Sequence, residues 1–550
     1  MTRRSPATVA DLPEHAPVVI AGGGPSGLMA ALDLARRGVA SVVIEPRLDV
    51  DPYRPRAKTT NARTMTMLRA LGLADEIRRV APLSVDYSED VVFCTGVDGH
   101  ELRRFRHAFQ LYADGFAHSP EIGQQIPQPL VEQVLREAVA RHPRCLLLLG
   151  PRVDAVADAV ADADSDHPVV TVSDGYGGCR RIRADYVIGA DGGASAVRKS
   201  LGIAMEGTSA PRPNFNVVFR SRELADRVSV PAAVQYWIVG EVSGMLGRLD
   251  LTDRWWTIVQ GVDPAHCDDP AGLVRRLAGV GDDVDVEVLG SDPWTAQMLL
   301  ATGYGRGRVF LVGDAAHLNP PWGGHGFNTC AVDALNLTWK IAAALQGWAG
   351  PALLGSYEAE RRPAARRMID VAANNGNQLA YSFADPALTR DDAAGGAARR
   401  AAHDRLAVKD AEFHAEGVVL GYRYPDSALV TPDGSAPPPF DPVVYTPSAH
   451  PGSLLPHLPL HGRASVYDLL GDGFTLLLCR DRTVVDHTLL CDVDRRGVPL
   501  EVVEVTGANA ARARELWEAE AVLVRPDQHV AWRGDDLTAL PAALHRAAGR

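Results

Sequence analysis

The stretch VVIAGGGPSG, residues 18–27, decides the fold class of this chain. Four apolar residues, typical of a short buried strand, lead directly into G-x-G-x-x-G at Gly22, Gly24 and Gly27. Gly22 permits a tight turn, Gly24 lets backbone amides approach a pyrophosphate, and Gly27 lets a following helix pack closely on the strand. The stretch therefore predicts the phosphate-binding turn of a dinucleotide-binding βαβ unit.

The residues after this turn complete the unit. Apolar side chains recur with helical spacing over 28–35, and Gly38 follows where a helix C-terminus favours glycine. The run SVVIE, residues 41–45, is typical of a second buried strand, and its last residue, Glu45, would accept hydrogen bonds from a ribose. Strand, helix, strand and terminal acid together favour dinucleotide binding over a glycine-rich turn in an unrelated α/β fold.

Two further strands end in glycine and aspartate, ADYVIGADG at 184–192 and RVFLVGDAAH at 308–317. A simple NAD dehydrogenase does not need three such strand ends in one crevice, whereas a long cofactor with a ribityl chain does. Asp314 would bind ribityl or ribose hydroxyls, and the turn PPWGGHGFN at 320–328 would lie against a flat ring. The helix expected after this turn would stabilise negative charge on a reduced ring through its N-terminal dipole. The pattern favours FAD.

These motifs resemble those of the single-component FAD-dependent aromatic hydroxylases, the p-hydroxybenzoate hydroxylase and phenol hydroxylase group. The strand end at 184–192 begins a second motif, which is similar to the family's D-G-x-x-S-x-x-R. The strand end at 308–317 and the turn after it form a third motif, similar to G-D-A-A-H followed by P-x-x-G-G-x-G-x-N, here from Gly313 to Asn328. The resemblance covers most of the chain. It implies an α/β fold: a Rossmann-like (GR2-type) FAD-binding domain, an inserted β-sheet substrate domain and a thioredoxin-like C-terminal domain.

The resemblance also implies a set of FAD contacts. A segment Ile126-Pro127-Gln128 matches one in which the glutamine contacts FAD, and residues 56–63 resemble a loop that crosses the pyrophosphate and ribose. The residues carried over as cofactor-binding are Gly22, Gly24, Pro25, Ser26, Gly27, Glu45, Arg47, Arg56, Arg63, Gln128, Asp191, Gly192, Gly313, Asp314, Gly324, Gly326, Phe327 and Asn328. No second dinucleotide fingerprint is present for NAD(P)H, which agrees with a family in which the nicotinamide binds transiently; NADPH is preferred over NADH as the expected reductant.

The implied chemistry is that NAD(P)H reduces the flavin, O2 adds to form a C4a-hydroperoxide, and one oxygen atom is transferred to an aromatic carbon. Pro320 and Pro321, which are rigid and lack N–H groups, would wall the oxygen side. His325 would relay or accept the phenol proton, or alternatively pack outside the pocket. The candidates for substrate binding are Gln235, Trp237, Trp294 and Trp322, with sheet packing as the alternative role of the aromatic ones. The expected partners are O2, NAD(P)H and an aromatic small molecule of the polyketide, secondary-metabolite or hydroxypyridine kind, in a possible homo-oligomer.

Changes in composition and residue pattern along the chain predict four regions. Residues 205–300 contain strand-like runs and tryptophans, and a stretch rich in Pro, Ser and Gly precedes a final alternation of strands and helices that has no C-x-x-C. The expected division is an FAD-binding domain at 1–204 and 301–415, a β-sheet substrate domain at 205–300, a linker at 416–461 and a thioredoxin-like domain at 462–550.

Composition excludes other classes. With 56 Lys+Arg against 68 Asp+Glu the formal net charge is −12, so a nucleic-acid binder is not expected. No secretory signal and no apolar run of roughly 20 residues is evident, so neither export nor a membrane span is expected. The seven cysteines include no C-x-x-C and the histidines are dispersed, which predicts free thiols, no metal site and a cytoplasmic location.

Three competing functions follow from the same pattern. A flavin-dependent halogenase would carry W-x-W-x-I-P, which the run Trp255-Trp256-Thr257-Ile258 does not match. A Baeyer–Villiger or epoxidising monooxygenase on the same fold differs only in pocket protonation, which no motif records. A non-catalytic flavin-binding protein would show no substrate-dependent oxidation of NAD(P)H.

Overall fold

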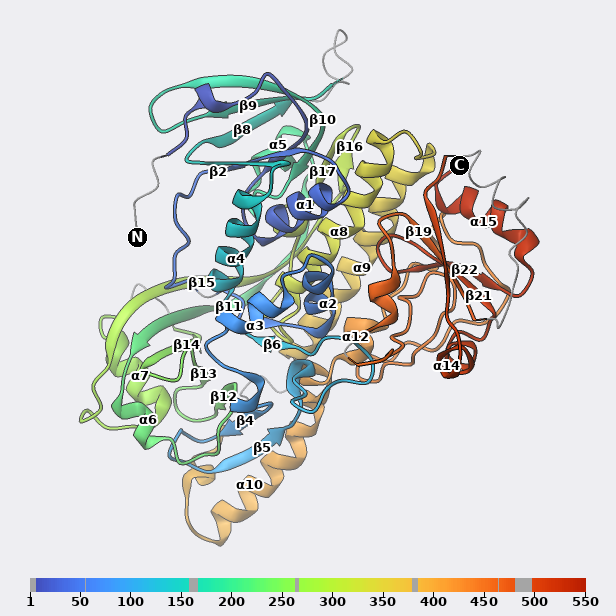
Figure 1. Cartoon of the computed structure of the whole chain (residues 1–550). Coiled ribbons are helices and arrows are strands. Elements are labelled where there is room, and N and C mark those ends of the chain that lie inside the picture. Colours follow the sequence, from blue (N-terminus) through green and yellow to red (C-terminus); the bar gives the residue numbers. More distant parts are fainter. Residues whose placement is uncertain are drawn as a thin grey trace.

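The computed structural model describes residues 6–54, 56–157, 167–262, 267–377, 384–462, 464–479 and 497–550. In Figure 1 a parallel sheet with helices on it lies at the top, a large, mainly antiparallel sheet at the lower left and a small C-terminal sheet at the right. No helix among these residues is long and apolar enough to cross a bilayer. The α/β class predicted from the glycine motif is confirmed.

The first sheet has β1 at its centre, in the order β16-β17-β10-β1-β2-β7. Strands β17, β10, β1, β2 and β7 are parallel, β16 is an antiparallel edge strand, and β8 and β9 extend β10 as antiparallel strands. Their bounds are β1 (His15–Ala21), β2 (Ser41–Glu45), β7 (Cys145–Leu149), β8 (Arg152–Ala157), β9 (Val169–Ser173), β10 (Cys179–Gly189), β16 (Gly305–Arg306) and β17 (Val309–Leu311). The strands predicted in the first glycine motif and at Glu45 are therefore neighbours.

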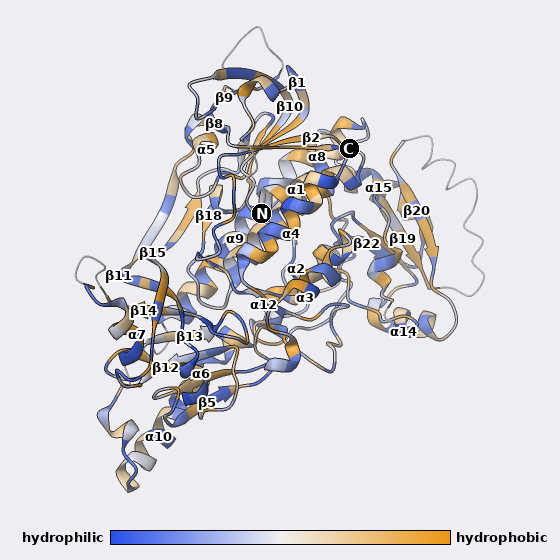
Figure 2. Cartoon of the chain, turned by 60° about the vertical axis from the view of Figure 1, so that its left-hand side comes forward, coloured by the Kyte–Doolittle hydropathy of each residue, from blue (hydrophilic) through white to orange (hydrophobic). Residues whose placement is uncertain are grey.

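Helices pack on this sheet because their apolar stripes face it. Helix α1 (Pro25–Arg36) starts with a proline after Gly24 and is buried over most of its length, packing against α8 (His325–Leu345) and α4 (Gln128–Arg141). The hydrophobic colour of α1 and of the strands beneath it marks this core (Figure 2). The remaining helices are α2 (Ala62–Ala70), α3 (Ala74–Val80), α5 (Ala196–Ser200) and α9 (Ala352–Asn377).

The second sheet has the order β18-β15-β11-β14-β13-β12-β4-β5 and contains the strands predicted within 205–300. Its bounds are β4 (Val91–Cys94), β5 (Glu101–Phe105), β11 (Met205–Arg220), β12 (Gln235–Ile238), β13 (Gly244–Arg248), β14 (Arg254–Gln260), β15 (Glu287–Ala301) and β18 (His317–Leu318), with helices α6 (Glu223–Arg227) and α7 (Pro270–Ala278) beside it. The predicted boundary needs a correction here. Residues 91–105, assigned to the FAD-binding domain, supply β4 and β5, because β4 pairs in parallel with β12 across a long sequence separation.

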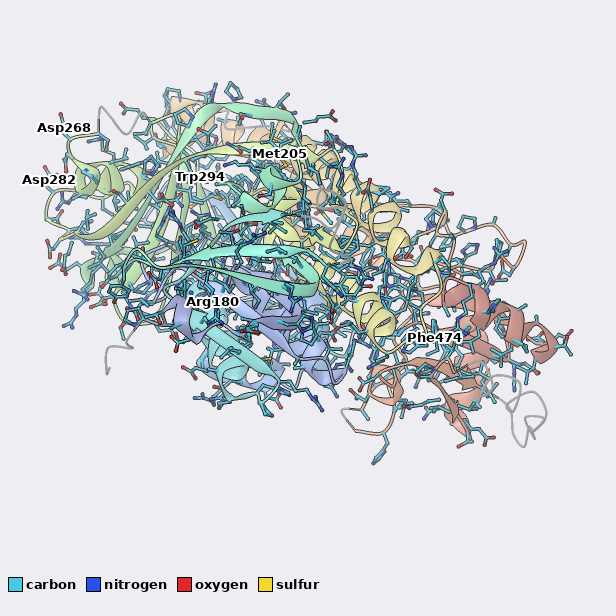
Figure 3. All side chains as sticks on the ribbon, turned by 90° about the horizontal axis from the view of Figure 1, so that it is seen from above. Arg180, Met205, Asp268, Asp282, Trp294 and Phe474 are labelled. Atoms are coloured by element: carbon cyan, nitrogen blue, oxygen red, sulfur yellow. The ribbon has the colours of Figure 1, made fainter. Side chains whose placement is uncertain are left out.

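The C-terminal sheet has the order β20-β19-β21-β22 and confirms the predicted thioredoxin-like arrangement. Its elements are β19 (Phe474–Leu478), β20 (Leu500–Glu504), β21 (Ala521–Val524), β22 (Val530–Gly534), α14 (Ala508–Trp517) and α15 (Leu540–Ala547). Trp294 on β15 and Phe474 on β19 lie well apart in Figure 3, in the second sheet and the C-terminal sheet. Cys491, counted among the free thiols, lies outside the described residues.

The stretch 416–461 is not a free linker. It begins with helix α12 (Glu416–Leu420), and side chains such as Tyr424, Leu429 and Leu455 are buried. The bridge from Leu454 to His529 and backbone hydrogen bonds such as that from the Gly452 amide to the Val530 carbonyl oxygen, at 2.8 Å, tie it to the C-terminal sheet. Its Pro, Ser and Gly residues prevent regular strands, but its apolar residues still pack between the domains.

Candidate active site

The first and second motifs touch backbone to backbone. Gly22 has φ +105°, and a Cβ on it would lie 2.3 Å from the carbonyl oxygen of Ala190. A Cβ on Gly27 would lie 2.0 Å from the carbonyl oxygen of Gly22. Only glycine fits at these two positions, so the turn after β1 is closed against the end of β10.

The third motif joins them from the neighbouring strand. Gly313 has φ +61°, and a Cβ there would meet the Ser26 hydroxyl at 2.7 Å. Arg198, from the second motif, donates to the carbonyl oxygens of Ala315 at 3.1 Å and Gly193 at 2.9 Å. All three motifs therefore meet at the carboxyl ends of adjacent parallel strands, where open α/β sheets bind their ligands.

The residues at this edge fit a dinucleotide. Among the described residues, nothing lies within 4 Å of a Cβ built on Gly24, which leaves the N-terminal amides of α1 open to a phosphate. Glu45, 4% exposed, accepts the Gly23 amide at 2.7 Å and so stands beside the turn. Asp314 is exposed although Gly313 and Ala315 on either side are buried. An open phosphate cradle with a carboxylate on each side fits FAD.

Asn328 fixes the turn at 320–328. Its Oδ1 accepts the amide of Asn61 at 3.0 Å, and its Nδ2 donates to the carbonyl oxygens of Gly324 at 2.7 Å and Thr59 at 3.2 Å. Gly323 and Gly324 both have positive φ, at 83° and 67°, which lets the chain turn sharply into α8. Gly326 and Phe327 follow in the first turn of that helix. Pro320 is buried and Pro321 half-buried just before the turn.

His325 is held beneath this turn. Its side chain is buried, and its Nε2 would lie 2.5 Å from a Cβ on Gly323. Among the described residues Nε2 has no hydrogen-bond partner. Burial lowers the pKa of His325 to about 4, so the ring is neutral at pH 7. In the neutral ring, Nε2 accepts or donates a hydrogen bond according to the tautomer, and the imidazole is a weak base.

Several predicted cofactor residues have protein partners of their own. The carboxylate of Asp191, next to Gly192, accepts the amides of Ala196 at 2.7 Å and Val197 at 3.1 Å, so it caps α5. Arg47 donates to Glu45 at 2.7 Å. Gln128 starts α4, and its Oε1 accepts the Ala57 amide at 3.3 Å. Pro25 is the first residue of α1, and Arg56 is exposed.

Arg63, predicted as an FAD contact, has its partners in the protein at the C-terminal part of the chain. Its guanidinium is buried and donates to the Gln528 side chain, to the carbonyl oxygen of Asp527 at 3.1 Å and to the Tyr422 hydroxyl at 3.3 Å. These partners belong to the C-terminal part of the chain rather than to the strand ends. The helix α2 begins at Ala62, and its rotation directs Arg63 to the domain interface.

The four predicted substrate residues lie on or beside the second sheet. Trp237 stacks on Phe93 with ring centroids 5.1 Å apart, and its Nε1 donates to Gln235 at 3.4 Å. Trp294 donates to Asn216 at 2.8 Å. Trp237 belongs to one apolar cluster, against which Trp294 and Trp322 also pack. The structure thus brings the three tryptophans to one aromatic region beside the turn.

Three buried charged residues were not singled out by sequence reasoning. Lys58 lies 3.9 Å from the ring centroid of Trp256 and lines a small pocket with Arg56, and burial lowers its pKa to about 7. Lys409 and Glu412 pair at 2.9 Å near the flavin turn. Apart from the charges themselves, nothing in the sequence pointed to these residues, because they lie in stretches whose composition favoured an exposed loop or helix.

Comparisons with known proteins agree with this geometry. Residues 15–372 match the family model for the FAD binding domain, and residues 448–550 match that for the aromatic-ring hydroxylase C-terminal domain. The chain belongs to the FAD-dependent aromatic-ring hydroxylases. The second match begins before the boundary predicted at 462, as the packing of the 416–461 stretch requires.

This aromatic-ring hydroxylase is similar along nearly its whole length to named monooxygenases and to a solved flavoprotein structure. It is 32% identical to phenol 2-monooxygenase of Pseudomonas sp. (strain EST1001), over 95% of the chain and 90% of the relative. It is 31% identical to a putative polyketide hydroxylase of Streptomyces halstedii, over 96% and 94%. The solved structure of RebC with bound 7-carboxy-K252c has a TM-score of 0.88 at 34% identity, covering 98% of this chain and 100% of that one. The hydroxylase is thus a flavoprotein monooxygenase with FAD as its cofactor.

Asp314→Ala should lower FAD affinity by about tenfold to a hundredfold, because a hydrogen bond to a charged acceptor is lost. Fluorescence titration of the apoprotein with FAD measures this. Asp282→Ala, on an exposed loop of the second domain (Figure 3), is the matched control and should bind FAD normally. An Asp314→Ala protein that retains stoichiometric FAD at wild-type affinity would contradict the assignment.

Proposed function

We propose that this hydroxylase uses NAD(P)H and O2 to hydroxylate a phenolic or related aromatic small molecule of the polyketide or hydroxypyridine kind. The observation that carries the proposal is the meeting of three dinucleotide motifs with a glycine turn beside a cluster of tryptophans. Relatives named phenol and polyketide hydroxylases support the substrate class.

The residues divide the work in a simple way. The amides of the α1 N-terminus would bind the pyrophosphate, Glu45 a ribose and Asp314 the ribityl hydroxyls. Bound FAD would supply the electron transfer from NAD(P)H and the activation of O2. The N-terminus of α8 would stabilise negative charge on the flavin, and Pro320 and Pro321 would exclude water.

His325 would bind the phenol oxygen or its proton. His325→Phe should leave FAD bound but slow oxygen transfer about tenfold or more, or raise uncoupled release of hydrogen peroxide, because the imidazole nitrogens under the turn are lost. The ratio of product to NAD(P)H consumed measures the coupling. If coupling stays at the wild-type value, His325 has a packing role only.

The test of the function is oxidation of NADPH and of NADH by the FAD-loaded enzyme with phenols, hydroxypyridines and polyketide aromatics. A substrate that accelerates oxidation and gains one oxygen from ¹⁸O2 as a ring hydroxyl supports hydroxylation. A product with the label in an inserted ester or an epoxide would replace it by the Baeyer–Villiger or epoxidising alternative. FAD binding without any substrate-dependent oxidation would favour the non-catalytic flavin protein.

A further inference from the structure

Three buried polar atoms without partners come from separate parts of the chain to the flavin turn. Among the described residues, Glu412 Oε1, Asn375 Nδ2 and His325 Nε2 make no hydrogen bond, and each of these side chains is at most 3% exposed. A buried polar atom without a partner loses its hydrogen bonds to water and gains none in return, so such atoms are rare in folded proteins. Three of them around one turn indicate that a ligand completes their bonding.

The Glu412 carboxyl is the centre of this group. Glu412 lies in α11 (Asp410–Phe413), which follows α10 (Ala393–Arg405) and the 3₁₀ turn Leu406–Lys409. Its Oε2 accepts Lys409 Nζ at 2.9 Å, and Lys409 also donates to the carbonyl oxygen of Asn375 at 2.7 Å. The backbone amide of Gly323 faces the same carboxyl, so α11 reaches the flavin turn directly.

The surroundings of this carboxyl suit a flat aromatic molecule. Phe413, the next residue, packs edge-on against Trp237 with ring centroids 5.8 Å apart. Lys409 Nζ lies 5.6 Å from the Trp237 ring centroid, and Trp322 packs on Gly376 of α9. In Figure 1 the chain from α10 to α12 runs from the second sheet toward the C-terminal domain, past this region. The pair of charges thus stands between aromatic side chains and the turn.

We propose that Glu412 Oε1 is the hydrogen-bond acceptor for a hydroxyl or ring N–H group of the aromatic substrate, with Lys409 holding the carboxyl in place. This inference rests on the proposed function. Oε1 is buried and has no hydrogen-bond partner among the described residues, so a donor group of a bound substrate would satisfy it. Burial raises the pKa of Glu412 and Lys409 offsets only part of this, which a donor on Oε1 would further offset. Glu412 is then a specificity-determining residue that selects aromatic rings with an O–H or N–H donor.

The experiment compares binding of phenols with binding of their O-methyl ethers to the oxidised, FAD-loaded enzyme, without NAD(P)H, by titration calorimetry. Wild type should bind a phenol about tenfold to a hundredfold more tightly than its ether, because the ether has no donor. Glu412→Gln should reduce this ratio to below about threefold, since the charged acceptor is lost. Glu416→Gln, whose carboxyl accepts the Tyr112 hydroxyl at 2.5 Å, should keep the wild-type ratio.

A second variant is needed if Glu412→Gln fails to fold because it leaves Lys409 buried without a carboxylate partner. Lys409→Met with Glu412→Leu removes both charges at similar volume, a change that buried pairs often tolerate. It should bind FAD and show no preference for phenols over ethers. An unchanged preference in either variant, or equal binding of phenol and ether by a wild type that hydroxylates the phenol, overturns the role of Glu412 and leaves the proposed function standing. If the wild type binds neither the phenol nor the ether and turns over no phenol, both the role of Glu412 and the proposed function are overturned.

Discussion

Arg525→Ala should destabilise the protein by about 3–5 kcal/mol, because it leaves two buried carboxylates short of a cation. Arg525 is 1% exposed and donates to Glu360 at 2.6 and 2.8 Å and to Asp527 at 2.7 Å. Lys340 is the other cation of the cluster and binds Glu360 at 2.7 Å. Burial alone would raise the pKa of Glu360, but Arg525 and Lys340 outweigh it and hold that pKa well below its usual range. The cluster joins α8 and α9 to the C-terminal domain.

Denaturant unfolding of the FAD-loaded protein, followed by tryptophan fluorescence, measures this loss. The control is Arg79→Ala, whose exposed partner Glu76 lies one turn away on the same helix, and it should leave the midpoint unchanged. Arg525→Met combined with Glu360→Met should be less destabilised than the sum of the single variants, since no carboxylate is then left without its cation. If Arg525→Ala unfolds at the wild-type midpoint, the interface does not depend on this charge network.

The parts of the fold that sequence alone predicted are those encoded by neighbouring residues. The turn at 22–27, the acid at Glu45 and the turn at 320–328 each combine glycine spacing with a strand or helix within a few residues. Such local patterns have one structural solution, because a positive φ or a close backbone approach admits only glycine. Their meeting at one edge follows from parallel pairing of β1, β10 and β17.

The parts that sequence reasoning missed depend on contacts between distant segments. Nothing local in 91–105 shows that β4 pairs with β12 rather than with the first sheet. Arg63 is a predicted FAD contact because residues 56–63 resemble a cofactor loop, and nothing in that local pattern shows that its guanidinium also donates to Tyr422. Lys409 and Glu412 occur in an Ala- and Arg-rich helical stretch that favours an exposed face, and only the tertiary packing buries them. Charge, unlike glycine spacing, does not by itself predict burial.

Gly24→Ala should leave the fold intact and lower FAD affinity at least about tenfold, while Gly27→Ala should lose both stability and FAD. Gly24 has φ −77° and ψ 176°, which alanine adopts freely, and its Cβ would point into open space. The added methyl group then takes only the space that the pyrophosphate needs. At Gly27 the methyl group would lie 2.0 Å from the backbone oxygen of Gly22, which cannot move without opening the turn.

The two glycines therefore separate a ligand requirement from a packing requirement within one motif. Denaturant midpoint and FAD titration are measured on each variant, with Gly355→Ala on α9 as a control whose methyl group meets no neighbour; it should keep wild-type FAD affinity and raise the midpoint slightly, because alanine favours a helix interior. A Gly24→Ala protein with wild-type FAD affinity would mean that the pyrophosphate does not approach α1 at that residue. A Gly27→Ala protein with wild-type stability would contradict the packing argument, because it would mean that the added Cβ does not come within 2.0 Å of the Gly22 carbonyl oxygen. Because one methyl group is added in both cases, the difference between the two results depends on position alone.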